Sequence, residues 1–537
     1  MDQTTPRQAG LFPDQMGQTA VRRRQMTSLA HRDPADQPRD GAPAWTRGEG
    51  DASVPAPPLW LAAIPAGIAI ALLPVYLVSG IVVGIAVVGV LLARPRLALY
   101  ALAFTVPYQG LTEVRFQGVN VTVTEATFVL LLVGWGTARA AGRLSAPRLG
   151  PLTVAIGLLL SLLVLSCTAA TNLVLSAKEL VKWVEVAGVT LIGQSLLERP
   201  RDRAGLFAAL ALAAVSQGVY GLLQSILLWG PSHFMIGPWL LRAYGSFEQP
   251  NPFGGYLGLH LPLALSVALY GASGRWVRGA VVAATAVIGL CLVATMSRGA
   301  WLGQVTGILV VVLTASRAAR HAVATFGGLG VVVIGAAWPV LPSAITDRVQ
   351  SIFASLVAFG SAANALTPEN WAVKERLSQW TAGWRMFSAN PLVGVGIGNY
   401  NPAYDDYRLP EWPVALGHAH NHYLTIAAEA GILAAVAYVV VLIVAVRQTR
   451  RAWRTAGTSF DRAIALGALG SIGALATHNL VDVLFVHGMS VTVGLILALA
   501  GPGTPASPVA SLGRAAATGS RPPVTMMGAV AALPAVA

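Results

Sequence analysis

Residues 423–446, YLTIAAEAGILAAVAYVVVLIVAV, form a stretch dominated by Ala, Val, Ile and Leu. An α-helix needs about 20 such residues to cross the hydrocarbon core of a bilayer. Apolar blocks of similar length recur along most of the 537-residue chain. The sequence therefore predicts an all-α polytopic membrane protein.

The composition agrees with this fold class. Hydrophobic residues make up 55% of the chain, charged residues 11%, and the mean hydropathy is +0.63, whereas a soluble domain carries about 25% charged residues. The formal net charge is +13, but residues 1–58 hold equal numbers of basic and acidic residues. The positive excess lies in short loops between apolar blocks, where it orients membrane proteins. We therefore expect a lipid bilayer as partner and no nucleic acid.

We expect about 12 to 14 transmembrane helices, of which three are short and could be merged or re-entrant. The candidate spans lie near residues 59–77, 79–93, 97–109, 123–139, 150–169, 180–197, 204–228, 252–271, 279–296, 299–315, 322–340, 423–446, 463–481 and 486–501. Arginines concentrate in alternate loops, which the positive-inside rule assigns to the cytoplasm.

This topology divides the chain into five parts. They are a disordered cytoplasmic tail (1–58), transmembrane helices (59–340), an extracytoplasmic loop subdomain (341–422), C-terminal transmembrane helices (423–501) and a low-complexity tail (502–537). A loop as long as 341–422 is unusual unless it is functional or disordered. Arg376, Trp380 and Trp384 recur in it at helical spacing, which predicts an ordered subdomain.

Three alternating histidines stand where this loop re-enters the membrane, in HAHNHYLTIAAEAGILA (418–434). Histidine titrates near neutrality and can accept a proton from a hydroxyl. His418, His420 and His422 could instead be interfacial residues that bond to neighbouring backbone, or metal ligands together with Asp405 and Asp406. Because neither spacing matches a zinc signature, we expect no metal and no cofactor.

Two arginines lie on the outer side, where the charge bias disfavours them: Arg298 in MSRGAW and Arg242 in RAYGSFEQPNPFGGYL. A guanidinium matches phosphate geometry, so an anionic lipid headgroup is the natural ligand; a snorkelling or plain loop charge is the alternative. His478 and Asp482, at i and i+4, predict a local hydrogen bond or a polar site. Trp380 could stack on a sugar ring or pack the loop subdomain.

Together these motifs resemble the O-antigen ligase and polymerase superfamily, membrane enzymes that use polyprenyl-diphosphate-linked glycans. The resemblance covers roughly Arg242 to Asp482, with the ligase-like core from about residue 242. MSRGAW is similar to the family's Ser-Arg-Gly junction, and ERLSQWTAGWRMFSANPLVGVGIGNY resembles its Arg-x-x-x-Trp segment leading into Pro-Leu-Val-Gly-Val-Gly. His420-Asn421, followed after nine residues by Gly431, fits the ligase pattern, whereas Ala434 departs from it.

The resemblance implies a catalytic His420, a donor diphosphate bound by Arg298 and Arg376, and a weaker contribution from Arg242. The candidate supporting residues are Asn421, His418, His422, His478, Asp482 and Trp380.

The implied function is a glycosyltransferase of the O-antigen ligase type in the bacterial inner membrane. It would move a glycan from undecaprenyl diphosphate to a hydroxyl acceptor on the periplasmic or outer face, with inversion and without a metal. The acceptor stays open between a lipid A core sugar (ligase), a growing O-antigen or exopolysaccharide glycan (polymerase) and a protein (O-oligosaccharyltransferase). A transporter of an anion or lipid-linked sugar would explain the helices but not the outer subdomain.

Overall fold

The structure, a computed structural model, describes residues 75–116, 119–147, 149–316 and 371–501, with scattered residues between 318 and 350. Both predicted tails, most of the predicted span 59–77, much of 322–340 and the first part of the predicted loop subdomain lie outside the described residues.

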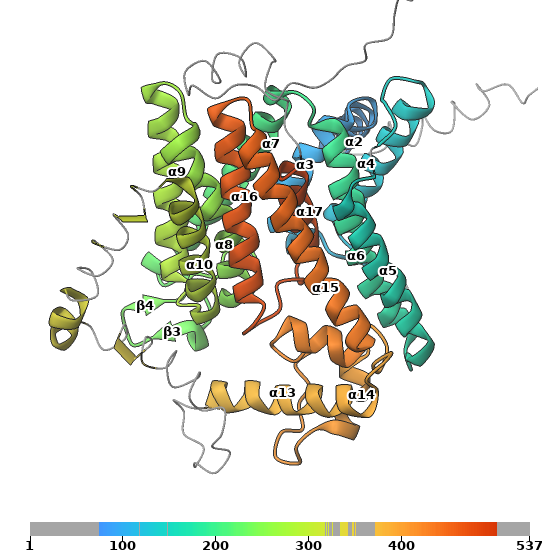
Figure 1. Cartoon of the computed structure of the whole chain (residues 1–537), viewed down its shortest axis with the longest axis vertical. Coiled ribbons are helices and arrows are strands. Elements are labelled where there is room, and N and C mark those ends of the chain that lie inside the picture. The colour runs from blue at the N-terminus through green and yellow to red at the C-terminus, as the bar shows by residue number, and fades with distance from the viewer. Residues whose placement is uncertain are drawn as a thin grey trace, which may run out of the picture. The chain divides into compact units, whose positions relative to one another are not determined.

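The predicted all-α class is confirmed for the described residues (Figure 1). The helices are α2 (Val75–Ala93), α3 (Pro95–Tyr108), α4 (Val123–Ala140), α5 (Pro151–Ser166), α6 (Leu173–Leu196), α7 (Pro200–Ile226), α8 (Pro250–Ser266), α9 (Arg275–Ala294), α10 (Arg298–Ala315), α13 (Trp371–Ala389), α14 (Tyr400–Tyr407), α15 (His422–Thr455), α16 (Ser459–His478) and α17 (Met489–Leu499).

Each predicted span that falls within the described residues corresponds to one of these helices. By length and composition, six are able to cross a membrane: α5, α7, α8, α9, α10 and α15. The pair α2 and α3, bent by 119° at its break, adds a seventh if it counts as one span. Other helices are too short or too polar for this criterion, as α17 with 11 residues shows. The polytopic class is thus confirmed, and the number of 12 to 14 crossings stays a prediction.

Two short antiparallel hairpins lie in loops between helices. Strand β1 (Val114–Phe116) pairs with β2 (Val119–Val121), with Val114 opposite Val121, and β3 (Met235–Ile236) pairs with β4 (Leu240–Leu241). The second hairpin leads directly into Arg242.

Glycines set the contact between α10 and α16. Gly299, Gly303 and Gly307 recur every four residues and so share one face of α10. A Cβ at Gly303 would meet the carbonyl oxygen of Ala474 at 2.8 Å, so only glycine permits this approach. Small residues allow such close packing of membrane helices. The first of them, Gly299, adjoins His478, and the contact therefore holds the start of α10 against the end of α16.

Helix α15 is interrupted near its beginning. Gly431 has φ 77° and ψ 179°, a conformation that is essentially restricted to glycine. At the break, two backbone groups of α15 form hydrogen bonds with the preceding loop. The carbonyl of Ala428 accepts from the N–H of Val395 (2.9 Å), and the N–H of Ile432 donates to the carbonyl of Pro391 (2.8 Å). The first part of α15 is thus fastened to residues 391–395.

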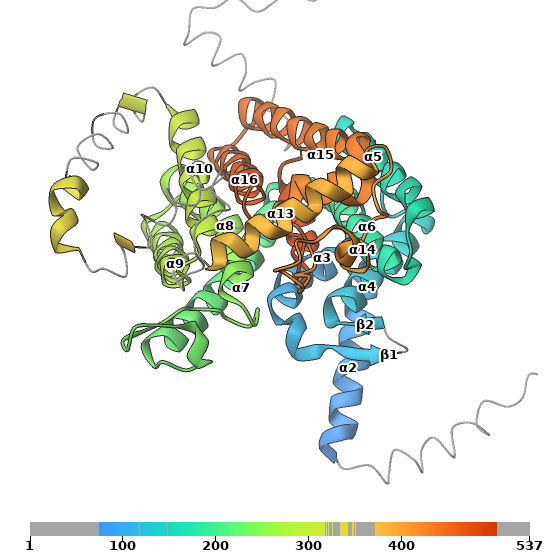
Figure 2. The same cartoon turned by 90° about the horizontal axis from the view of Figure 1, so that it is seen from below.

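Helix α13 runs crosswise over one end of the other helices, with α14 beside it (Figures 1 and 2). Both pack around a small hydrophobic core of their own, made of Ala382, Met386, Val395, Tyr400, Tyr404, Ala419 and Ala428. Gln379 joins them, because its backbone carbonyl accepts from the Tyr400 hydroxyl (2.6 Å) and its amide donates to that of Tyr404 (2.9 Å). The ordered segment predicted around Arg376 is therefore present.

Candidate active site

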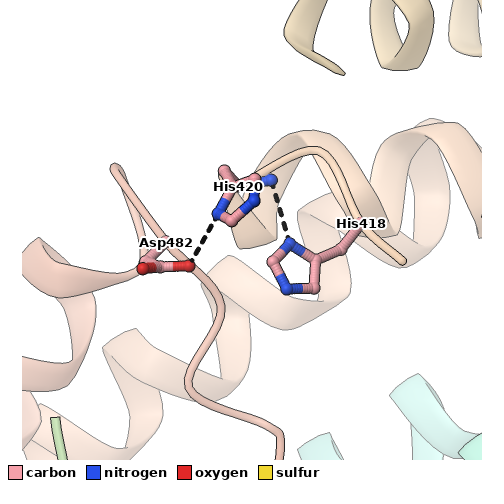
Figure 3. Close-up of side chains that lie close together, drawn as sticks. All are labelled: His418, His420 and Asp482. Atoms are coloured by element: carbon pink, nitrogen blue, oxygen red, sulfur yellow. Dashed lines mark hydrogen bonds and ion pairs between the residues drawn. The ribbon is translucent and has the colours of Figure 1, made fainter. Parts of the chain in front are cut away.

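His420 lies in the loop between α14 and α15, in contact with Trp380 of α13. Its backbone has φ +50°, a left-handed conformation that is uncommon for residues other than glycine. The next residue, Asn421, is the N-cap of α15, and its side-chain oxygen accepts from the N–H of Leu424 (3.1 Å). Trp380 of α13 donates from its indole N–H to the His420 carbonyl (3.4 Å). The loop is thus fixed from both sides with the His420 ring turned toward Asp482 (Figure 3).

Asp482, in the loop between α16 and α17, joins His420 to Arg376. Its Oδ1 lies 3.0 Å from Nδ1 of His420, and its Oδ2 lies 3.6 Å from a guanidinium nitrogen of Arg376. Burial acts to raise the pKa of Asp482, but the His420 hydrogen bond and the neighbouring positive charges hold it well below its usual range. An ionised carboxylate only accepts hydrogen bonds, so Nδ1 of His420 donates its proton to Asp482.

His418 supports this arrangement from the other side (Figure 3). Its Nδ1 accepts the backbone N–H of His420 at 3.1 Å, and the two rings meet edge to face with centroids 4.4 Å apart. Burial, reinforced by the nearby His420, lowers the pKa of His418 to about 4. His418 is therefore neutral at physiological pH, and its Nε2 carries the proton.

Arg298 is the first residue of α10, directly after the N-cap Ser297. The next residue, Gly299, lies against His478 and Val481, which brings the start of α10 to the loop that carries Asp482. The start of α10, with Arg298, thus lies at the same end of the helices as Arg376 and His420. Binding of a donor diphosphate by these arginines stays a prediction.

Arg242 holds a turn at the same end. Its Nε donates to the carbonyl of Thr295 (2.9 Å), and a terminal nitrogen donates to Oδ1 of Asn251 (2.9 Å). These contacts link the segment 242–251 to the residues just before Arg298. Arg242 therefore acts as a brace for that junction in this conformation.

His422 faces away from Asp482. Its ring is buried and stacks on Phe485 with centroids 4.5 Å apart, and its edge meets Tyr438 at 4.9 Å. Within the described residues neither of its ring nitrogens has a hydrogen-bond partner. The expectation that the interfacial histidines bond to neighbouring backbone is wrong for the His422 ring, because aromatic packing takes the place of hydrogen bonding.

His478 and Asp482 do not form the local side-chain hydrogen bond that their spacing suggests. Nε2 of His478 has no partner among the described residues, whereas the Asp482 carboxylate turns to His420. A backbone hydrogen bond from the Asp482 N–H to the His478 carbonyl (3.0 Å) forms instead. Helix α16 ends at His478, so the helical spacing no longer applies beyond it.

Ligand atoms of His418, His420 and Asp482 lie within 4.8 Å of one another and could hold a metal ion. Two imidazoles and a carboxylate suit zinc, but the Arg376 charge beside Asp482 opposes a cation there. Asp405, which the metal interpretation included, pairs with Arg408 at 2.9 Å instead. Metal independence stays a prediction.

Contacts that the sequence did not predict fix the segment 391–399 behind the site. Glu429 accepts the backbone N–H of Tyr400 (3.0 Å). The Asn399 side chain donates to the Ser176 hydroxyl (2.9 Å) and accepts the backbone N–H of Asn172 (2.7 Å). No sequence spacing indicates these pairs, because their members lie between 29 and 227 residues apart in the chain.

The arrangement has the parts of a general base beside an anion site. A carboxylate that holds one imidazole nitrogen fixes the tautomer and stabilises the imidazolium formed when the other nitrogen takes a proton. Nearby guanidinium groups can stabilise negative charge on a leaving phosphate.

Residues 280–439 match the family model described as O-antigen ligase. The match includes Arg298, Arg376, His420 and Gly431, and it ends before Asp482. No curated protein matches the chain. The predicted resemblance to the O-antigen ligase superfamily is confirmed, over a narrower region than 242–482. Within the 537-residue chain, similarity to the O-antigen ligase family is thus shown for residues 280–439.

Proposed function

We propose that this protein, which carries an O-antigen ligase region, is an inverting, metal-independent glycosyltransferase. It moves a glycan from an undecaprenyl-diphosphate carrier to a hydroxyl acceptor on the outer face of the bacterial inner membrane. The observation that carries the proposal is the hydrogen bond of His420 to Asp482, next to Arg376 and the start of α10 at Arg298.

In the proposed step the acceptor hydroxyl loses its proton to Nε2 of His420 as its oxygen attacks the anomeric carbon of the donor sugar. The bond between that carbon and the diphosphate oxygen breaks, and the diphosphate leaves with the electron pair. Arg298 and Arg376 stabilise its charge. Because the attacking oxygen approaches opposite the leaving group, the anomeric configuration inverts. A diphosphate is already a good leaving group, so no second carboxylate is needed as general acid.

His420→Ala tests the enzyme proposal. General base catalysis contributes about 10²- to 10⁴-fold, and we expect a loss of that order in glycan transfer by purified protein supplied with lipid-linked donor and acceptor. His233→Ala, at an exposed histidine, is the matched control and should retain full activity. Transfer by His420→Ala at near the wild-type rate would exclude the assigned role. Activity that disappears in EDTA and returns with Zn²⁺ would contradict metal independence.

The acceptor can be identified in the native host. The gene is deleted and complemented with the wild type or with His420→Ala, and carrier-linked and mature glycans are resolved by gel and mass spectrometry. Full-length polymer accumulating on the carrier indicates a ligase or a protein O-oligosaccharyltransferase. Single repeats accumulating there indicate a polymerase.

A transporter predicts a different result. Proteoliposomes would accumulate an anion or a lipid-linked sugar without forming a glycosidic bond. The His420–Asp482 pair favours the enzyme, because a base beside arginines has a direct role in transfer.

A further inference from the structure

A groove lies between α10, α15 and α16, beside the C-terminal part of α15. It encloses about 1100 Å³ of space outside atoms, part of it open to the surroundings. Its walls are mainly aliphatic and include Leu442, Ile443 and Ile472, while Arg447 and Arg450 line it at the C-terminal end of the α15 wall. Gly473 helps to keep it open, since a Cβ there would already meet Val310 at 3.2 Å.

The two arginines have no counter-charge within the described part of the chain. No acidic residue lines the groove, and neither Arg447 nor Arg450 forms an ion pair or a hydrogen bond with another described residue. Both are exposed. Residues at i and i+3 share a helix face, where like charges oppose each other. A bound anion would relieve that repulsion.

The depth of the arginines suits a lipid headgroup. Arg450 lies 19 residues beyond the break at Gly431, which is roughly 28 Å at 1.5 Å per residue. The hydrocarbon core of a bilayer is about 30 Å thick. With the break near one boundary, Arg447 and Arg450 reach the other, and the aliphatic walls lie at the depth of acyl chains.

We propose that this groove binds one anionic phospholipid, with an acyl chain against Leu442, Ile443 and Ile472 and the phosphate between Arg447 and Arg450. Basic pockets between transmembrane helices recognise anionic headgroups, and guanidinium groups match phosphate geometry. A free phosphate would leave the apolar walls uncovered, and a neutral lipid would leave the two charges unopposed. The site lies along α15 away from His420 and is independent of the proposed transfer reaction.

Native mass spectrometry of the purified full-length protein tests this site. The protein is titrated with phosphatidylglycerol or with phosphatidylcholine of the same acyl chains. We expect the wild type to retain one phosphatidylglycerol about tenfold more tightly than phosphatidylcholine. The double variant Arg447→Gln with Arg450→Gln should lose this preference for phosphatidylglycerol. Arg451→Gln with Arg454→Gln changes the same charge on the same helix without lining the groove, and it should behave as the wild type.

A second variant tests the groove without changing charge. Ile443→Trp should fill it and reduce retention of both lipids. Equal retention of the two lipids by the wild type, or equal loss in the Arg451 and Arg454 control, would overturn the proposal. Displacement of the lipid by inorganic phosphate at comparable concentration would also overturn it, because the ligand would then be a free anion.

Discussion

Asp482 uses its two oxygens for different partners, one for Nδ1 of His420 and one for Arg376. The first contact sets which ring nitrogen of the histidine is basic. The second lowers the proton affinity of the carboxylate and places a guanidinium beside the base. One buried side chain therefore controls both the tautomer of His420 and the position of a cation.

Asp482→Asn keeps the size of the side chain but removes its charge. Its amide can present an N–H to His420 and so favour the wrong tautomer, and we expect transfer to fall about 10²- to 10⁴-fold. Initial rates of glycan transfer, measured on protein that elutes as a single species, check this result. Asp405→Asn, at an exposed carboxylate that pairs with Arg408, is the control. An Asp482→Asn enzyme with more than a tenth of wild-type activity would contradict the role of the carboxylate.

His418 makes the folded state sensitive to acid. Its pKa is lowered to about 4 by burial, whereas a histidine in the unfolded chain titrates near 6.5. Between these values the unfolded chain binds a proton that the folded chain excludes, so stability is highest above pH 6.5 and falls toward pH 4. Because the His418 ring is partly exposed, we expect about 1 kcal/mol of destabilisation at pH 5.

The measurement is the melting temperature in detergent at pH 7 and at pH 5. In His418→Gln the glutamine can still accept the His420 N–H. The melting temperature of this variant should fall less between pH 7 and pH 5 than that of the wild type. His233→Gln, at an exposed histidine, should show the full decrease. An unchanged pH dependence in His418→Gln would show that His418 does not sense acid.

At this scale the sequence identifies which residues matter better than it identifies their partners. The spacing from His420 to Gly431 is local and could be recognised. The partner of His420 is Asp482, which lies 62 residues later in the chain. For Asp482 itself, helical spacing suggested a nearer partner, His478. That spacing fails because the helix ends there.

At the scale of elements, the break in α15 fastens the start of this helix, which follows His420 in the chain, to residues 391–395. The carbonyl of Ala428 and the N–H of Ile432 bond to residues 395 and 391 rather than along the helix. Gly431 is required twice, for its positive φ and because a Cβ would lie 2.1 Å from the Leu392 carbonyl oxygen.

Gly431→Ala should therefore displace residues 391–395 and loosen the start of α15. We expect a loss of about 3 kcal/mol or more in the free energy of unfolding, with reduced transfer. Thermal unfolding in detergent measures the first effect. Gly157→Ala, on α5 with nothing within 4 Å of an added Cβ, is the control and should be neutral or stabilising. Equal melting of Gly431→Ala and wild type would show that the break tolerates a side chain.

The apolar runs were sufficient to predict most of the helices, because membrane insertion depends on composition and length. The break in α15 was not predicted, since its apolar run continues through Gly431. Whether a glycine in such a run breaks the helix depends on what packs against it. Here the packing partner is a loop about 40 residues earlier in the chain.

At the scale of the whole molecule, a buried ion pair joins distant helices. Arg203 of α7 lies 3.0 Å from Asp461 of α16, and both side chains are 2% exposed. A terminal nitrogen of Arg203 also donates to the Leu499 carbonyl at the end of α17 (2.5 Å).

Arg203→Ala leaves the Asp461 carboxylate buried without its ion-pair partner. We expect the free energy of unfolding to fall by about 3–5 kcal/mol. Arg203→Met with Asp461→Leu should recover part of it, because no charge is then left buried. A double-mutant cycle on thermal unfolding measures both effects. Arg201→Ala removes an exposed arginine two residues earlier in α7 and should be nearly neutral. A double variant less stable than Arg203→Ala would mean that the pair itself is strongly stabilising.

The position of Asp482 in the chain also has a consequence for biosynthesis. Translation proceeds from the N-terminus, and His420 enters the membrane environment before α16 and the loop after it have been made. The nascent chain then contains the histidine, and it contains Asn399 and Ser176 to brace the preceding segment, but it lacks the carboxylate that orients the ring. The site is therefore complete only after residue 482 has been made, and ribosome-bound intermediates that end before residue 482 have a histidine without its orienting partner.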